Sequence, residues 1–356
     1  IYLFDNNKID EAHSMFLELL KINSKDAYVY IFIGIIEAMR KNYKESITLF
    51  KKAENINNKI PEIYYNLGKI YTRLNNLNLS IFNYQKSIEL DSKHYLSYQN
   101  LVLILFKNGK YDDASLIIEK ALKILPDDPK LNYNYGLVLS KTNRFNEAND
   151  QFKKLLYLTP ENVGVKINYG HLLCELHLFS EAKIQFENAL ALEPNSPALH
   201  MSYAELLFRT NNYEESWKEY EWRFIGEKSE VPLKVSPIAP KGSINNYQKY
   251  HTILLIAEQG LGDTLQFIRY VKLLRDKGKF IFLWAPKPLH TIIKQSKLVD
   301  KFLTFEECSN FADGCYLPLM SLPLLYGIPY KNTLSDTSYF KTSKNSDKKW
   351  SESFSC

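Results

Sequence analysis

Two glycines follow a short apolar run near residue 256, where a strand is expected to turn into a helix. The run from Thr252 to Ala257 is rich in β-branched and aliphatic residues, which predicts a buried parallel strand. Gly260 and Gly262 permit a tight turn, and the backbone amides that begin the next helix can hold an anion. The third glycine of a dinucleotide-binding fingerprint and the lysine of a P-loop are both missing, which excludes nicotinamide and P-loop sites at this turn.

A second set of polar residues recurs in the first half of the chain at a spacing of 34. The set consists of Asn66, Asn100, Asn134 and Asn168, and basic residues recur seven positions after this register at Arg73, Lys107, Lys141 and Arg209. An amide both donates and accepts hydrogen bonds, so a row of amides can follow an extended peptide backbone. The row resembles the asparagines of the peptide-holding repeats of O-linked N-acetylglucosamine transferase. Two alternatives stay open: asparagine is common at this position in such repeats, and the basic residues can be a solvated rim rather than a surface for an acidic partner.

A repeat of 34 residues positions these side chains. Small residues at the repeat period are Ala12, Ser46, Ser80, Ala114, Ala148, Ala182 and Ser216, and a glycine or another small residue stands twelve positions before most of them. This is the pattern of the tetratricopeptide repeat, in which helix pairs stack because no pair buries its apolar face alone. Small residues are needed where two helices cross closely. The sequence predicts an α-solenoid over residues 1–225, about six and a half repeats, whose concave groove binds a protein or peptide.

The remaining residues predict a linker and a second domain. Trp217, Tyr220 and Trp222 end the last repeat as an apolar edge on which another domain can dock. Prolines and glycine without helical periodicity predict an extended linker over residues 226–250. Strands are expected at residues 252–257, 279–284, 300–305 and 315–319, with helices at 264–275 and from 288. This alternation predicts a doubly wound α/β sheet over residues 251–340.

Three sequence strings carry a more specific resemblance. They run from Glu258 to Tyr270, from Tyr316 to Pro323, and from Tyr220 to Arg223. They resemble bacterial proteins that join these repeats to a domain similar to family 9 glycosyltransferases, the heptosyltransferase group. The resemblance implies a GT-B fold of two Rossmann-like halves, of which residues 251–340 are the N-terminal half on the acceptor side. It also implies a nucleotide sugar as donor, a sugar acceptor and no metal ion.

The resemblance assigns roles to residues of the loop after the first strand. Asp263 corresponds to the proposed general base, which takes the proton of the acceptor hydroxyl. Residues expected to contact substrate are Gln259, Gly260, Gly262, Gln266 and Arg269. An equally weighted alternative is that Asp263 only caps the following helix.

The second half that would bind the donor is not seen in the sequence, because residues 341–356 are rich in serine and lysine and read as a linker or truncated tail. Both ends of the chain are expected to be truncated, so this polypeptide is expected to bind no cofactor and to be inactive alone. The alternative function is a non-catalytic repeat scaffold for protein–protein interaction.

Composition and charge exclude several classes of function. The net charge of +5 is scattered, without the dense basic stripe of a nucleic-acid surface, and no apolar run is long enough to span a membrane. The four cysteines form no C-x-x-C pair, so no metal or redox site is expected, and free thiols fit the cytoplasm. His251 and His290 are expected to be structural or surface residues.

Overall fold

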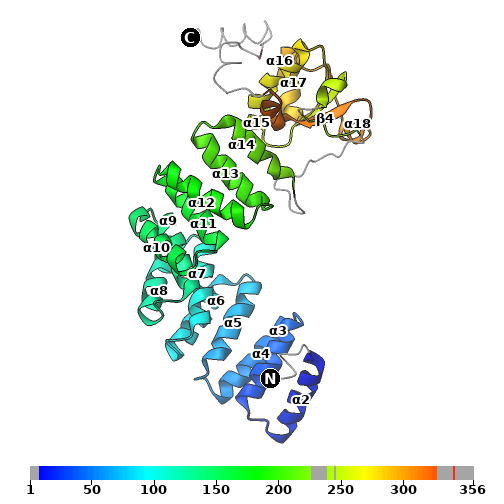
Figure 1. The fold of residues 1–356 in the computed structure, drawn as a ribbon. Helices are drawn as coiled ribbons and strands as arrows, with labels where there is room; N and C mark the ends of the chain where they lie inside the picture. The colour runs from blue at the N-terminus through cyan, green and yellow to red at the C-terminus, as the bar shows by residue number, and fades with distance from the viewer. Residues whose placement is uncertain (1–7, 226–238, 244–245, 327–339, 341–356) are drawn as a thin grey trace, which may run out of the picture. The chain divides into compact units, whose positions relative to one another are not determined.

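The computed structural model describes residues 8–225, 239–243, 246–326 and 340. Contacts divide the chain into two compact units, residues 1–176 and 177–356. The first unit is entirely helical in its described part (Figure 1). Its helices are α2 (Ile9–Ile22), α3 (Ala27–Met39), α4 (Tyr43–Ile56), α5 (Pro61–Arg73), α6 (Leu77–Leu90), α7 (Tyr95–Lys107), α8 (Tyr111–Ile124), α9 (Pro129–Lys141), α10 (Phe145–Leu158) and α11 (Val163–Glu175).

Consecutive helices of the first unit pack in pairs, α3 on α4, α5 on α6, α7 on α8 and α9 on α10, and each pair packs on the next. The close crossing predicted from the small residues is present within these pairs. A Cβ atom added to Gly68 would lie 2.7 Å from the ring of Tyr84, and one added to Gly136 would lie 3.0 Å from the ring of Phe152. The Ser80 hydroxyl donates to the Gly68 carbonyl at 3.0 Å, so the small residue also bonds across the crossing.

Each repeat has one residue with a positive φ angle in the turn between its two helices. These residues are Lys41, Asn75, Gly109, Asn143, His177 and Asn211, with φ between 57° and 72°. Their spacing is the repeat period of 34. Glycine and asparagine are the residues that adopt this left-handed conformation most readily, so four of the six positions have a favourable residue type.

The second unit begins with three repeat helices and continues into a sheet with surrounding helices. The repeat helices are α12 (Phe179–Leu192), α13 (Pro197–Arg209) and α14 (Tyr213–Tyr220), followed by the 3₁₀ helix η1 (Glu221–Phe224). The sequence groups them with the earlier repeats, but contacts place them with the sheet. Trp217 and Tyr220 pack against the core of the sheet domain, as expected of a docking edge.

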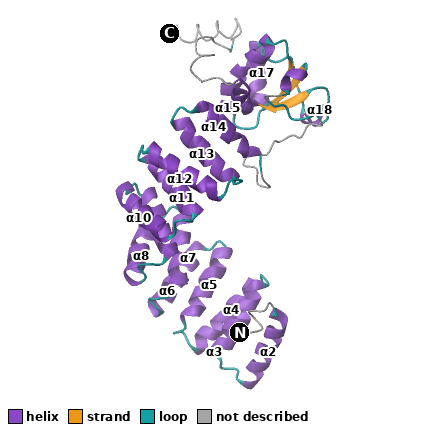
Figure 2. Ribbon diagram, viewed as in Figure 1, coloured by secondary structure: helices purple, strands orange, loops and turns teal. Residues whose placement is uncertain are grey.

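In the described residues, four parallel strands form a sheet in the order β3-β2-β1-β4. Figure 2 shows this sheet in orange next to the helices of the second unit. They are β1 (Thr252–Ile256), β2 (Phe280–Trp284), β3 (Lys301–Phe302) and β4 (Cys315–Pro318). All four lie within the segments that the apolar runs predict. The helical segments between and around them are η2 (Tyr247–Lys249), α15 (Leu261–Phe267), η3 (Ile268–Tyr270), α16 (Val271–Asp276), η4 (Lys287–Leu289), α17 (His290–Ser296), α18 (Phe305–Ser309), η5 (Leu319–Ser321) and α19 (Leu322–Tyr326).

The described end of the predicted linker packs on the sheet. Lys241 pairs with Tyr316 of β4 in a parallel bridge, and the Gly242 amide donates to the Tyr316 carbonyl at 2.8 Å. Tyr247 is buried in the core of the sheet domain. Residues 239–243 and 246–250 are therefore part of the α/β layer, while residues 226–238 and the tail 341–356 lie outside the described residues.

We expect Gly68→Ala to lower the free energy of unfolding of the repeats by about 1–3 kcal/mol, because the new methyl group overlaps the Tyr84 ring. Gly34→Ala is the matched comparison, since its Cβ would lie 3.2 Å from Phe50 and a helical alanine regains up to about 1 kcal/mol of propensity. Urea titrations followed by circular dichroism give both values. Equal losses for the two variants would contradict the steric explanation.

Candidate functional site

The loops that follow β1 and β4 lie side by side, because these two strands are neighbours in the sheet. The chain order reverses between β1 and β4, since β2 lies on the other side of β1. In open α/β sheets, ligands bind beyond the carboxyl ends of the strands at such a reversal. Gln259 and Gly260 lie in the loop after β1 and Asp263 in the first turn of α15, while Ser321 is the last residue of η5, which follows β4. This edge is therefore the candidate site of the second unit.

A buried guanidinium connects the two loops to the last repeat. The Arg223 side chain is 0% exposed and donates to Glu258 Oε1 at 2.9 Å and to Ser321 Oγ at 2.9 Å. Its other terminal nitrogen donates to Glu221 Oε1 and to the Tyr220 carbonyl, at 2.8 and 2.9 Å. The Ser321 hydroxyl in turn donates to Glu221 at 2.6 Å. The network joins the three sequence strings, Tyr220–Arg223, Glu258–Tyr270 and Tyr316–Pro323, at one place.

The electrostatics of the network are dominated by burial. Burial raises the pKa of Glu258 to about 7, while the charge of Arg223 and its hydrogen bond act to lower it. The Glu221 carboxylate also raises it. This Glu258–Arg223 pair is not predicted from the sequence. The sequence does contain one indication of the pair, because Glu258 directly follows an apolar strand. A charged group at such a position is buried and needs a partner.

Asp263 lies in the first turn of α15 and caps the helix. Its Oδ2 atom accepts a hydrogen bond from the Gly260 backbone amide at 3.1 Å. The helix cap that the sequence predicts as the alternative role of Asp263 is therefore present. Gly262 has open space around it, with no atom within 4 Å of an added Cβ, so the loop is accessible at this point.

The other predicted substrate-binding residues are distributed around the same loop. Gln259 donates to the Tyr220 hydroxyl at 2.7 Å, which ties the loop to the last repeat. Gln266 is exposed and lines a cavity, whereas Arg269 is half-buried on η3. Of the five, the structure brings Gln259 and Gln266 toward Tyr220.

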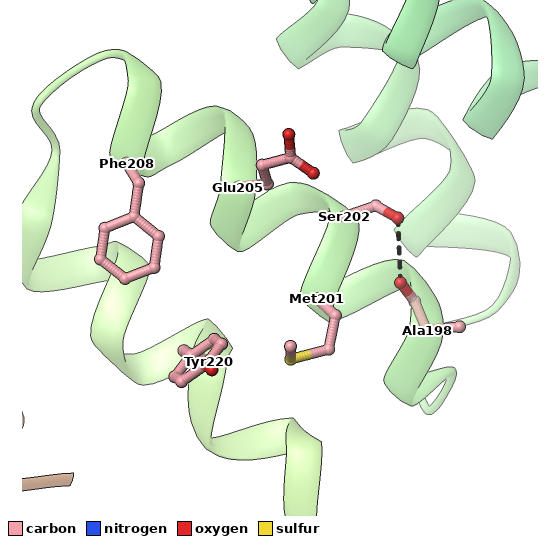
Figure 3. Close-up of a pocket in the computed structure, with 6 residues that line it drawn as sticks. All are labelled: Ala198, Met201, Ser202, Glu205, Phe208 and Tyr220. Carbon is pink, nitrogen blue, oxygen red and sulfur yellow. Dashed lines mark hydrogen bonds between the residues drawn. The ribbon is translucent and has the colours of Figure 1, made fainter. Parts of the chain in front are cut away.

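Two cavities flank the aromatic side chains at the end of the repeats. One has a volume of about 450 Å³ and is lined by Ala198, Met201, Ser202, Glu205, Phe208 and Tyr220 (Figure 3). The other, about 380 Å³, includes Trp217, Gln266 and Phe267 and shares Phe208 and Tyr220 with the first. Trp217 meets Phe267 edge to face at 5.5 Å, while Trp222 stacks on His200 at 3.8 Å instead of facing the sheet.

The asparagine row of the first unit is partly used within the protein. Asn66, Asn100 and Asn168 each donate from Nδ2 to the carbonyl four residues earlier, at 2.8–2.9 Å. Asn168 also donates to the Tyr133 hydroxyl at 2.6 Å, and Asn134 lies half-buried on α9. These bonds reduce the donors that the row can offer, so a partner would meet mainly the amide oxygens.

A cavity of about 380 Å³ lies beside one member of the row. It is formed by α5, α6 and α7 and is lined in part by Asn100 and Lys107. On α5, burial lowers the pKa of Lys69, and the charge of Arg73 lowers it further. Together α5, α7 and α9 carry five basic residues, Lys69, Arg73, Lys107, Lys130 and Lys141, against one acidic residue, Glu62.

The described part of the chain offers no site for a metal ion, and its cysteines are buried. No group of three or more His, Cys, Asp or Glu side chains there is arranged to hold a metal ion. Cys174, Cys308 and Cys315 are buried, and burial raises the pKa of the latter two to about 11. Among the described helices, none has the length and apolar character to cross a membrane. His290 Nε2 donates to the Ala285 carbonyl at 2.9 Å, which fits a structural residue.

Comparisons with known proteins identify the helical repeats. A family model described as "TPR repeat" matches residues 34–75, and models described as "Tetratricopeptide repeat" match residues 61–94, 83–114, 100–163 and 170–221. The chain is similar to the C-terminal part of a TPR repeat-containing protein from Cytophaga hutchinsonii, at 18% identity and a TM-score of 0.54, over 64% of this chain and 96% of the other.

Two further solved structures superpose on this chain with lower TM-scores. A tetratricopeptide repeat protein from Parabacteroides merdae matches at 13% identity and a TM-score of 0.49, over 64% of this chain and 91% of its own. YrrB, described as a TPR protein with an unusual peptide-binding site, matches at 22% identity and a TM-score of 0.42, over 49% of this chain and 90% of its own. No curated protein matches the sequence.

We expect Glu258→Gln to change the pH dependence of stability of the second unit. A carboxyl group whose pKa is raised by folding stabilises the fold fully below its unfolded value, about 4.3, and this contribution is lost as the pH rises through about 7. The free energy of unfolding of the wild type should therefore fall relative to Glu258→Gln between pH 4.5 and 7, on the order of 1–3 kcal/mol.

Urea titrations followed by tryptophan fluorescence measure this effect, because all four tryptophans belong to residues 177–356. Glu181→Gln on α12 is the control, since Glu181 is exposed. A difference between the wild type and Glu258→Gln that stays constant with pH would contradict a raised pKa for Glu258.

Proposed function

Since this chain is a tetratricopeptide-repeat protein, we propose that it captures a partner protein by holding an extended acidic segment against helices α5, α7 and α9. The observation that carries the proposal is the cavity beside Asn100 and Lys107 on a strongly basic set of helices. Stacked repeats present continuous surfaces of this kind to extended ligands.

The contacts of the first unit support this choice of ligand. Lys107 is exposed at the end of α7, so its ammonium group is available to a carboxylate. Asn100 uses Nδ2 for the Leu96 carbonyl, which leaves its oxygen to accept a backbone amide of the peptide. Charge attraction then provides affinity and speeds association, while the amide fixes the register of the bound chain.

Replacing Lys107 by alanine should weaken binding of a fluorescein-labelled Glu- and Asp-rich dodecapeptide about three- to tenfold, because one charge pair is removed from the cavity. Replacing Asn66, Asn100, Asn134 and Asn168 together by alanine should weaken the same binding further without loss of helix content. Fluorescence anisotropy at 50 and 200 mM salt gives the dissociation constants, and circular dichroism checks the fold.

Lys120→Ala is the matched control, because Lys120 is also an exposed lysine but lies on α8. It should change binding less than twofold. Equal losses for Lys107→Ala and Lys120→Ala would indicate non-specific charge attraction and contradict a site beside Asn100.

A second function concerns the α/β layer. We propose that residues 251–340 form the acceptor-side half of a glycosyltransferase-like domain in a protein that also carries a donor-binding half. The proposal is supported by the parallel strand order β3-β2-β1-β4 and by the glycine loop after β1, at the edge where the strand order reverses. The sequence strings that resemble family 9 glycosyltransferases meet at this edge through Arg223.

In such a transfer, Asp263 would accept the proton of the acceptor hydroxyl while that oxygen bonds to the anomeric carbon and the nucleoside diphosphate leaves. The Gly260 amide donates to Oδ2 of Asp263 and holds this atom in place. Oδ1 of Asp263 is not needed for the cap. Capping and proton transfer are therefore compatible in one carboxylate. A base fixed at a helix start also needs little reorganisation.

Asp263→Asn should lower the rate of sugar transfer by the full-length protein about 10²–10⁴-fold, since an amide cannot take the proton. Asparagine retains an oxygen for the cap, so the fold should be unaffected. Transfer is measured with a panel of radiolabelled nucleotide sugars, and binding of each donor by thermal shift.

Undiminished transfer by Asp263→Asn would exclude the base role and leave the residue as a cap. Absence of transfer and of donor binding in the wild-type full-length protein would exclude the glycosyltransferase proposal. The chain would then be a repeat scaffold whose sheet serves only to dock on the last repeat.

A further inference from the structure

We propose that the cavity between Met201, Phe208 and Tyr220 binds a cationic side chain, arginine or lysine, of a partner protein. This site lies in the last repeat, on α13 and α14, and is separate from the basic groove of the first unit. It selects the opposite charge, so it does not depend on the acidic-peptide proposal.

The walls of the cavity suit a cation with an aliphatic stem. The rings of Phe208 and Tyr220 meet at 75° with centroids 6.0 Å apart, so the cavity is bounded by two aromatic surfaces in different orientations. An arginine or lysine head group is attracted to such ring faces, and its methylene stem can lie along Met201. Figure 3 shows Met201, Phe208 and Tyr220 around the same space, with Glu205 at its margin.

The protein already holds one guanidinium against the same ring. The Arg223 guanidinium carbon lies 4.4 Å from the centroid of Tyr220, and carboxylates of Glu221 and Glu258 neutralise it. Tyr220 thus takes part in a cation–π contact within the fold. Because Arg223 is paired with two carboxylates, it opposes a second cation on the cavity side only weakly.

The charge of the last repeat also favours a cation. Helices α13, α14 and η1 carry five acidic residues, Glu205, Glu214, Glu215, Glu219 and Glu221, against three basic ones, Arg209, Lys218 and Arg223. These helices therefore carry a net charge of −2, in contrast to +4 on α5, α7 and α9.

Among the residues that line the cavity, Glu205 is the one carboxylate that can pair with this cation. The Ser202 hydroxyl donates to the Ala198 carbonyl at 3.0 Å, so it is held by its own helix. Glu205 is exposed at the margin and receives a hydrogen bond from Arg209 at 2.9 Å, which occupies one of its two oxygens. A partner's guanidinium or ammonium group can bind the other oxygen while its stem fills the apolar space.

The test uses the complete chain and four labelled nonapeptides of the form (Gly-Ser-X)₃, in which X is arginine, lysine, leucine or glutamate. Fluorescence anisotropy at low salt should show binding in the order arginine, lysine, then the other two. Glu205→Gln should weaken binding of the arginine peptide about tenfold, and Phe208→Leu should weaken it several-fold while keeping an apolar wall.

Glu214→Gln is the matched control, because Glu214 is an exposed glutamate of the same repeat that pairs with Lys218 away from the cavity. It should change binding less than twofold. Equal losses for the two glutamates, or tighter binding of the leucine peptide than of the arginine peptide, would overturn the proposal. The acidic dodecapeptide separates the two sites, since Glu205→Gln should leave its binding unchanged.

Discussion

A guanidinium without contact with water needs acceptors from the protein, and those of Arg223 come from its own 3₁₀ helix and from two distant segments. Its partners are Glu221 on its own 3₁₀ helix, Glu258 after β1 and Ser321 after β4. Removing either carboxylate would take an acceptor from the buried guanidinium, which costs about 1–3 kcal/mol. The last repeat, the glycine loop and the loop after β4 are therefore fixed together, and the repeats end as one layer of the sheet domain.

Contacts divide the chain at residue 176 rather than at the end of the repeats, so the last repeat helices belong to the same compact unit as the sheet. Repeat helices normally interact only with their neighbours, so an array can be divided at any turn. In the last repeat, Trp217 and Tyr220 pack into the core of the sheet domain, and Gln259 reaches back to the Tyr220 hydroxyl. Here the next neighbour of the repeat is a sheet.

Local and periodic signals could be read from the sequence. The four strands, the helix pairs and the small residues at the crossings follow from apolar runs and from a period of 34, because these features depend on neighbouring residues. The Arg223–Glu258 pair could not be predicted from the sequence, since the two residues are 35 positions apart and become partners only when β1 and the last repeat meet. The asparagine row was found but its chemistry was incomplete, because Asn168 gives its amide hydrogens to Gly164 and Tyr133.

Tyr220 contacts the buried arginine, both cavities and the glycine loop of the second unit. Its ring lies against Arg223 and borders both cavities, and its hydroxyl accepts the hydrogen bond of Gln259. Burial raises the pKa of this phenol, while the charge of Arg223 and the hydrogen bond from Gln259 act to lower it. A side chain bound in the cavity as we propose would contact the ring that positions Gln259, one residue before the amide of Gly260 that holds Asp263. Binding at the repeat and the geometry of the glycine loop would then be linked through one aromatic side chain, without movement of the sheet.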